Sequence, residues 1–108
     1  MAYLKPLEGD WTTRDWGLKV LEEASELCES LKILHDDLAQ DKDNHLRDRA
    51  IYEACDVLQV VAGCLDAMGV TECEFERHVY EMQRCNDERG RHEKEEAKTL
   101  TVDWGAHD

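Results

Sequence analysis

The sequence predicts an all-α protein, a helical bundle of about three to four helices whose core is completed by oligomerisation. Apolar residues recur at steps of three and four over long stretches, which is the spacing of one helical face. A single proline and few β-branched runs argue against a sheet protein. A chain of 108 residues hides roughly 65% of its unfolded surface on folding, so a helical protein of this size often gains core from a partner chain.

The first helix is expected to begin near Thr12 or Thr13, either of which is a suitable N-cap, with Asp15 favourable in the first turn. Gly17 lies inside the pattern, where it either lets another backbone approach closely or marks a helix that begins after it. The apolar face of this helix is expected to comprise Trp16, Val20, Leu21, Ala24, Leu27, Leu31, Leu34 and Leu38.

Two further helices follow the polar connection "AQDKDNH". The second is expected from about His45 to Met68, with Gly69 at the left-handed position that ends many helices. "TECE" at 71–74 matches a capping box, so the third helix is expected to begin there and to end near Gly90. The chain is therefore read as a single domain with a leader (1–11), a helical core (12–90) and a charged C-terminal tail (91–108).

Composition excludes several classes of function. A formal net charge of −13 argues against nucleic acid or an anionic membrane as the main partner. The longest apolar run, 57–70, contains Gln59 and Asp66 and is too short to span a membrane. The five cysteines are odd in number and no apolar signal segment opens the chain, so free thiols and a cytoplasmic location are expected.

Two pairs of acidic residues share one spacing. Glu23 and Glu26 lie about 60° apart on one side of a helix, and Glu53 and Asp56 have the same relation on the next helix. Antiparallel helices that face each other through these pairs would gather four carboxylates, which repel one another unless cations neutralise them. Carboxylate oxygens suit Mg²⁺, or alternatively Mn²⁺, with substrate phosphates completing the coordination.

The alternative is that these acids are ordinary solvated charges. The chain contains 26 acidic residues, so some pairs at this spacing arise by chance. Glu53 and Asp56 differ from most because apolar residues follow on their side of the helix, which predicts partial burial. Histidine-containing di-iron motifs and Cys-x-x-Cys zinc motifs are absent from the sequence. A solvated position is expected for Glu22, Glu29, Asp36, Asp37 and Glu81.

"EEASE" (22–26) followed by "EACD" (53–56) resembles the EExxE…ExxD signature of the all-α nucleoside triphosphate pyrophosphohydrolases, the MazG-like superfamily. Dimeric dUTPases and phosphoribosyl-ATP pyrophosphohydrolase belong to the same superfamily. "NDERGRH" (86–92) is similar to the Asn-x-x-Arg-Gly segment that follows the third helix in many phage-type members. The resemblance covers roughly residues 16–91.

The resemblance implies roles for particular residues. The implied Mg²⁺ ligands are Glu23, Glu26, Glu53 and Asp56. Glu22 and Glu23 are the implied catalytic acids, with Glu22 orienting water or a neighbouring group. Asn86 and Arg89 would reach the triphosphate, although Cys85 stands where relatives often have lysine. Candidates to supply that charge are Lys32, Arg84 and Arg91, whose alternative role is as ordinary surface cations. Trp16 is a candidate to stack on the base, as are Trp11 and Trp104, although Trp16 lies in the apolar stripe and fits a core position as well.

The implied activity is Mg²⁺-dependent hydrolysis of a nucleoside triphosphate to the monophosphate and pyrophosphate, by a homodimer or homotetramer. Two alternatives stay open. One keeps the chemistry and takes phosphoribosyl-ATP as the substrate. The other is a non-catalytic helical oligomer that binds a nucleotide or a partner.

Overall fold

The computed structural model describes residues 2–37, 44–90 and 101–104. Within them the chain forms three helices, α1 (Thr13–Asp37), α2 (His45–Ala67) and α3 (Glu72–Glu88). Two very short strands, β1 (Tyr3–Leu4) and β2 (Thr101–Val102), pair in parallel and join the two ends of the chain. The all-α prediction is confirmed. The predictions for Leu38 and for tail residues 91–100 and 105–108 lie outside the described residues.

The local signals at the helix ends are also confirmed. Thr12 Oγ1 accepts a hydrogen bond from the Asp15 backbone amide (3.2 Å), and Asp15 Oδ2 accepts one from the Thr12 amide (3.1 Å). Thr71 Oγ1 accepts from the Glu74 amide at the start of α3 (3.1 Å). Gly69 and Gly90 both have positive φ and follow α2 and α3, as the left-handed termination requires.

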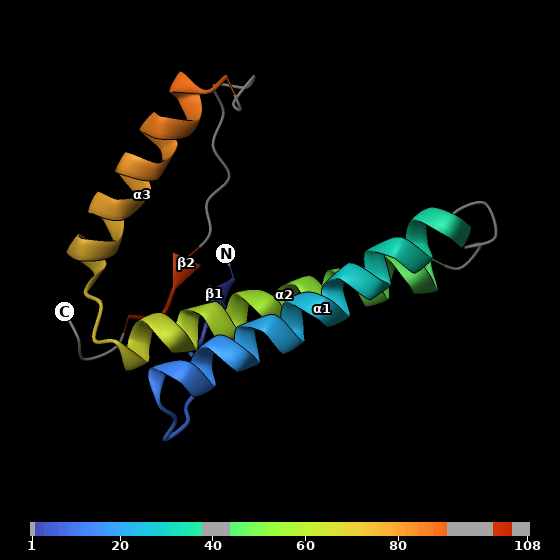
Figure 1. Cartoon of the computed structure of the whole chain (residues 1–108), viewed down its shortest axis with the longest axis horizontal. Coiled ribbons are helices and arrows are strands. Elements are labelled where there is room, and N and C mark those ends of the chain that lie inside the picture. The colour runs from blue at the N-terminus through green and yellow to red at the C-terminus, as the bar shows by residue number, and fades with distance from the viewer. Residues whose placement is uncertain (1, 38–43, 91–100, 105–108) are drawn as a thin grey trace.

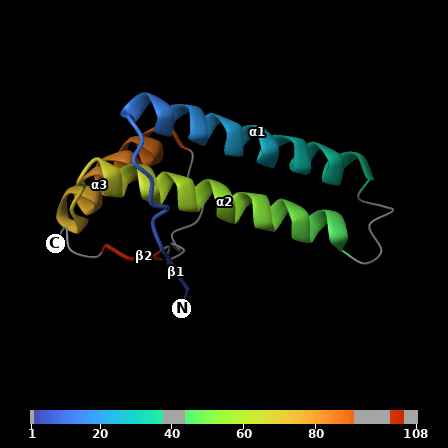
Figure 2. The ribbon, with the colours of Figure 1, turned by 90° about the horizontal axis from the view of Figure 1, so that it is seen from below.

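Helices α1 and α2 form an antiparallel hairpin whose two members lie side by side along most of their length (Figures 1 and 2). The core of the hairpin contains Trp16, which is only 2% exposed, with Ala50, Val60 and Ala62 of α2. The segment before α1 crosses α2 at Gly63, where an added Cβ would lie 2.4 Å from the Leu7 carbonyl oxygen. The close backbone approach is therefore at Gly63. Both expectations for Gly17 are wrong, because α1 begins before it and a Cβ there would meet nothing within 4 Å.

The face of α1 that packs on α2 differs from the apolar face that the sequence predicts for this helix. The buried residues of α1 are Trp16, Glu23 and Ser30, spaced two turns apart. Four residues at the other edge of this apolar face are exposed: Leu21, Ala24, Cys28 and Leu31. The hairpin therefore leaves apolar surface uncovered within the single chain.

Helix α3 leaves the hairpin at Gly69 and extends away from it (Figure 1). None of its residues is buried. Its first turn is linked to the end of the chain by the rings of Phe75 and Trp104, whose centroids are 4.9 Å apart. Consequently α3 adds little to the hairpin core of one chain.

No described helix combines the length and apolar character needed to cross a membrane. All five cysteines are free thiols, as the sequence predicted.

Candidate metal centre

The antiparallel hairpin brings the acids of α1 and α2 together. One carboxylate oxygen each of Glu23, Glu53 and Asp56 lies within 4.8 Å of the others. Glu22, Glu23 and Glu26 form a second group of the same size on α1. We call these five residues the acidic cluster. Glu23 belongs to both groups, whereas Glu26 is grouped with its own helix and not with the acids of α2.

Glu23 is the most enclosed member of the acidic cluster, with only 8% of its surface exposed. Its Oε1 atom forms an ion pair with Lys19 Nζ (3.2 Å). Its Oε2 atom is buried without a hydrogen-bond partner among the described residues, and so is Oε2 of Glu53. Buried carboxylate oxygens without partners cost free energy, which a bound cation would recover. The donor set and these two oxygens fit a hard divalent ion such as Mg²⁺.

Two titrating groups respond to the charge of the acidic cluster. Repulsion from Glu23 raises the pKa of Glu26, and desolvation, the charges of Glu53 and Glu22, and a side-chain hydrogen bond with Glu23 raise it further. The ion-paired hydrogen bond to Glu23 raises the pKa of Lys19; partial desolvation opposes this, and Glu22, Glu23 and Glu26 add to it. Both shifts have the same main source, the negative charge that the carboxylates of the cluster bring together.

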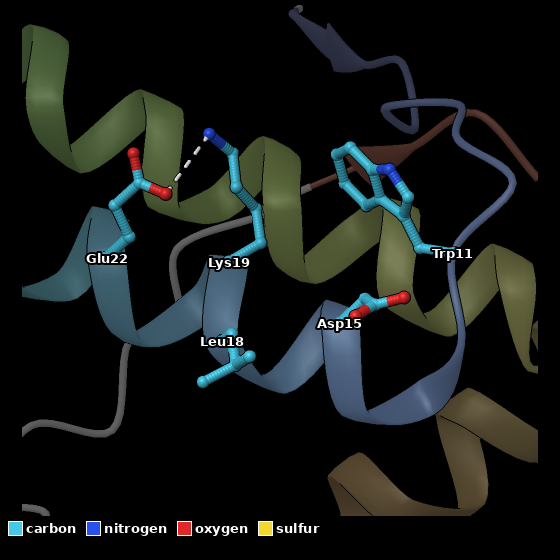
Figure 3. Close-up of a pocket in the computed structure, with 5 residues that line it drawn as sticks. All are labelled: Trp11, Asp15, Leu18, Lys19 and Glu22. Carbon is cyan, nitrogen blue, oxygen red and sulfur yellow. Dashed lines mark ion pairs between the residues drawn. The ribbon is translucent and has the colours of Figure 1, made fainter.

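A pocket of about 410 Å³ adjoins the acidic cluster toward the start of α1. Figure 3 shows Lys19 and Glu22 extending from α1 on the side where Trp11 stands, and their ion pair measures 3.7 Å. We call this the Trp11 pocket. Its lining residues are Trp11, Asp15, Leu18, Lys19 and Glu22.

A second pocket, of about 470 Å³, adjoins the acidic cluster toward the opposite end of the hairpin. We call it the Arg49 pocket, because Arg49 is the cation that lines it. Its lining residues are Ser25, Glu26, Glu29, Arg49 and Glu53. Along the hairpin the order is therefore an aromatic pocket, a group of carboxylates and a pocket with an arginine.

The other predicted substrate residues are not gathered at this place in one chain. Arg84 and Asn86 belong to the far part of α3, which points away from the hairpin, and Arg89 caps that end of the helix (Figure 1). Arg84 forms ion pairs with Glu81 (3.1 Å) and Glu88 (2.6 Å) of its own helix. Lys32 is exposed on α1, and Arg91 lies outside the described residues.

Trp16 is a core residue. With 2% of its surface exposed it has no accessible face for a base, which favours the packing interpretation that the sequence also allowed.

Sequence reasoning missed Lys19 and Arg49. Each precedes an acid of the cluster by four residues on the same helix, Lys19 before Glu23 and Arg49 before Glu53. This i, i+4 relation brings opposite charges together on a helix surface, and it was a signal that could have found both residues.

Comparison of the chain with protein-family models found no matching family, and the searches of curated proteins and of solved structures gave no match either.

Proposed function

We propose that this protein hydrolyses a nucleoside triphosphate to the monophosphate and pyrophosphate, with Mg²⁺ held by the acidic cluster. The observation that carries the proposal is Glu23: it is 8% exposed, it belongs to both carboxylate groups, and one of its oxygens is buried without a partner among the described residues. The resemblance of "EEASE" and "EACD" to the MazG-like signature supports the same activity.

Glu23, Glu53 and Asp56 would hold the metal between the two helices, and Glu22 and Glu26 would contribute from the open side of α1. When bound, Mg²⁺ supplies positive charge that neutralises phosphate oxygens and lowers the pKa of a bound water. Mn²⁺ has the same preference for oxygen ligands and would serve as well.

The residues of the chain have separate tasks in this reaction. Glu22 is exposed beside Glu23, where it can accept a proton from the attacking water. Lys19 holds Glu23 in position through their ion pair. Arg49 lies at the other side of the carboxylates, where its guanidinium would offset the charge that develops on the leaving pyrophosphate. All five thiols are free, which favours a reducing compartment such as the cytoplasm.

The test is release of pyrophosphate from a panel of standard and damaged ribo- and deoxynucleoside triphosphates, with Mg²⁺ and with EDTA. We expect metal-dependent release from at least one nucleotide, with loss of turnover in Glu23→Gln. If no nucleotide of the panel releases pyrophosphate while Mg²⁺ still stabilises the fold, the proposal is contradicted. It would leave phosphoribosyl-ATP hydrolysis and a non-catalytic binding role as the remaining interpretations.

A further inference from the structure

The Trp11 pocket has the chemistry of a binding site for a flat aromatic group. Trp11 is 40% exposed, so part of its indole is open to solvent. An exposed indole offers a face on which a nucleobase can stack, and such stacking tolerates different bases. Of the two neighbouring tryptophans Trp11 and Trp16, Trp11 is therefore the accessible one.

Trp11 also packs against its own chain on two sides. Its ring meets the buried ring of Trp16 edge to face, with centroids 4.7 Å apart and an interplanar angle of 64°. The backbone at Gly9 lies against the same indole, because a Cβ added there would be 3.0 Å from Trp11 Cδ2 and Cε2. A ring that is packed on two sides loses little conformational freedom when a ligand stacks on it.

The pocket connects this ring to the acidic cluster. Asp15, Leu18, Lys19 and Glu22 follow one face of α1 over seven residues, or roughly 10 Å along the helix axis. This is comparable to the separation between the base and the outer phosphates of an extended nucleotide. Lys19 and Glu22 line the pocket and form an ion pair with each other (Figure 3). Lys19 also pairs with Glu23 (3.2 Å), which links the pocket to the acidic cluster.

We propose that the Trp11 pocket is the base subsite, so that a bound nucleotide lies along the hairpin with its base on Trp11 and its phosphates over the acidic cluster toward Arg49. This assignment rests on the proposed function for the identity of the phosphate site. It adds the orientation of the bound nucleotide along the hairpin. It also names Trp11 as the residue by which the protein would distinguish a nucleotide from a phosphate chain without a base.

The experiment measures binding with Mg²⁺ present and hydrolysis blocked. The probes are the α,β-imido analogues of the four standard deoxynucleoside triphosphates, with inorganic tripolyphosphate as the ligand that lacks a base. The proteins are wild type, Trp11→Ala, Trp11→Phe and, as the matched control, Tyr80→Ala, which removes an exposed aromatic residue of α3. Circular dichroism verifies that each variant retains its helices.

We expect at least one imido nucleotide to bind wild type about tenfold more tightly than tripolyphosphate does, the size expected for one stacked base. Trp11→Ala should lose this difference in affinity between nucleotide and tripolyphosphate, and Trp11→Phe should keep most of it. Tripolyphosphate itself should bind all four proteins equally. Acrylamide quenching of the exposed indole should also fall when wild type binds the nucleotide. This second measurement tests the assignment without any substitution.

Two results would overturn the subsite: an unchanged difference in affinity in Trp11→Ala, or an equal loss for the nucleotide and tripolyphosphate, which would make Trp11 a structural residue only. Failure of the proposed function looks different. In that case wild type releases no pyrophosphate from natural nucleotides, while the difference in affinity that depends on Trp11 is still observed and the subsite stands.

Discussion

At Glu23 the two carboxylate oxygens have different surroundings. Oε1 is paired with Lys19, whereas Oε2 is buried without a partner among the described residues. Glu53 of the facing helix has an oxygen in the same condition. Two such atoms at one contact between helices weaken the metal-free fold, because each has lost its water without gaining a donor. A bound cation would give both oxygens a partner, and this leads to the first prediction.

Mg²⁺ should raise the melting temperature of the protein, and Glu53→Gln should abolish that rise while leaving the helical circular dichroism signal intact. The amide keeps the size of the side chain but removes the negative charge that the ion needs. The measurement is thermal unfolding at several Mg²⁺ concentrations. Glu76→Gln, an exposed site on α3, is the matched control and should respond as wild type does. An unchanged response in Glu53→Gln would remove Glu53 from the metal centre.

The raised pKa of Glu26 predicts a specific dependence on pH without metal. Repulsion from Glu23 makes the ionised form of Glu26 unfavourable in the folded state. Protonated Glu26 therefore stabilises the fold. This contribution is complete below the pKa that Glu26 has in the unfolded chain, and it is lost as pH rises through the raised pKa of Glu26 in the folded protein. In EDTA, Glu26→Gln should thus be more stable than wild type at neutral pH, and this advantage should shrink toward about pH 4. Thermal unfolding over this range is the measurement; an advantage that does not change with pH would contradict it.

At the scale of the elements, two glycines inside helices have opposite surroundings. An added Cβ at Gly63 of α2 would lie 2.4 Å from the Leu7 carbonyl oxygen and 2.8 Å from Trp16 Cη2, whereas one at Gly17 of α1 would meet nothing within 4 Å. Gly63→Ala should destabilise the protein by about 1–3 kcal/mol through overpacking. Gly17→Ala, its matched control, should stabilise it by roughly 0.5–1 kcal/mol through helix propensity. Urea unfolding measures both, and a neutral Gly63→Ala would show that the leader does not pack on α2.

The position of α3 leads to a prediction about which arginine would contact the phosphates of a nucleotide bound at the acidic cluster of one chain. Arg49 lines the pocket beside the acidic cluster, while Arg89 follows the end of α3 that points away from the hairpin. For an active nucleotide, Arg49→Ala should raise KM or lower kcat by about tenfold or more, because a lost donor on a charged group typically costs at least that much. Arg89→Ala should leave both constants near wild type. The opposite result would mean that α3 of another subunit reaches the site.

At this scale the sequence predicts the features that depend on residues close together in the chain. The caps at Thr12 and Thr71 and the termination at Gly69 and Gly90 depend on residues three or four apart. The cap at Thr71, the left-handed Gly69 and the end of the third helix near Gly90 were predicted correctly, and Thr12 was one of the two caps expected for the first helix. The pairing of Glu23 with Glu53 and Asp56 was also expected, because it follows from helix periodicity and an antiparallel hairpin. The direction of α3 and the crossing at Gly63 depend on contacts between distant segments, which periodicity does not specify.

At the scale of the whole molecule, the hairpin exposes two apolar stripes. On α1 the stripe comprises the exposed residues Leu21, Ala24, Cys28 and Leu31, and on α2 it comprises the exposed Ile51, Val61 and Met68 with the half-buried Leu58 and Leu65. Leu21 is 63% exposed and Met68 is 61% exposed. Both stripes have the spacing of three and four residues that packs one helix against another. The side of α1 that faces α2 carries Glu23 and Ser30. Part of the contact between the two helices is therefore made by polar groups.

We therefore expect a homodimer or homotetramer in which a second hairpin covers these stripes, completing a four-helix core that one chain lacks. Size-exclusion chromatography with light scattering should give a mass of about two or four times 12.5 kDa. Leu21→Lys combined with Leu31→Lys should shift the protein toward the monomer, because burying either charge at the interface is costly. Gln83→Lys at an exposed position of α3 adds the same kind of charge outside the stripes and should leave the mass unchanged. A wild-type protein that remains monomeric at high concentration would contradict this assembly, and the exposed leucines would then need a different partner.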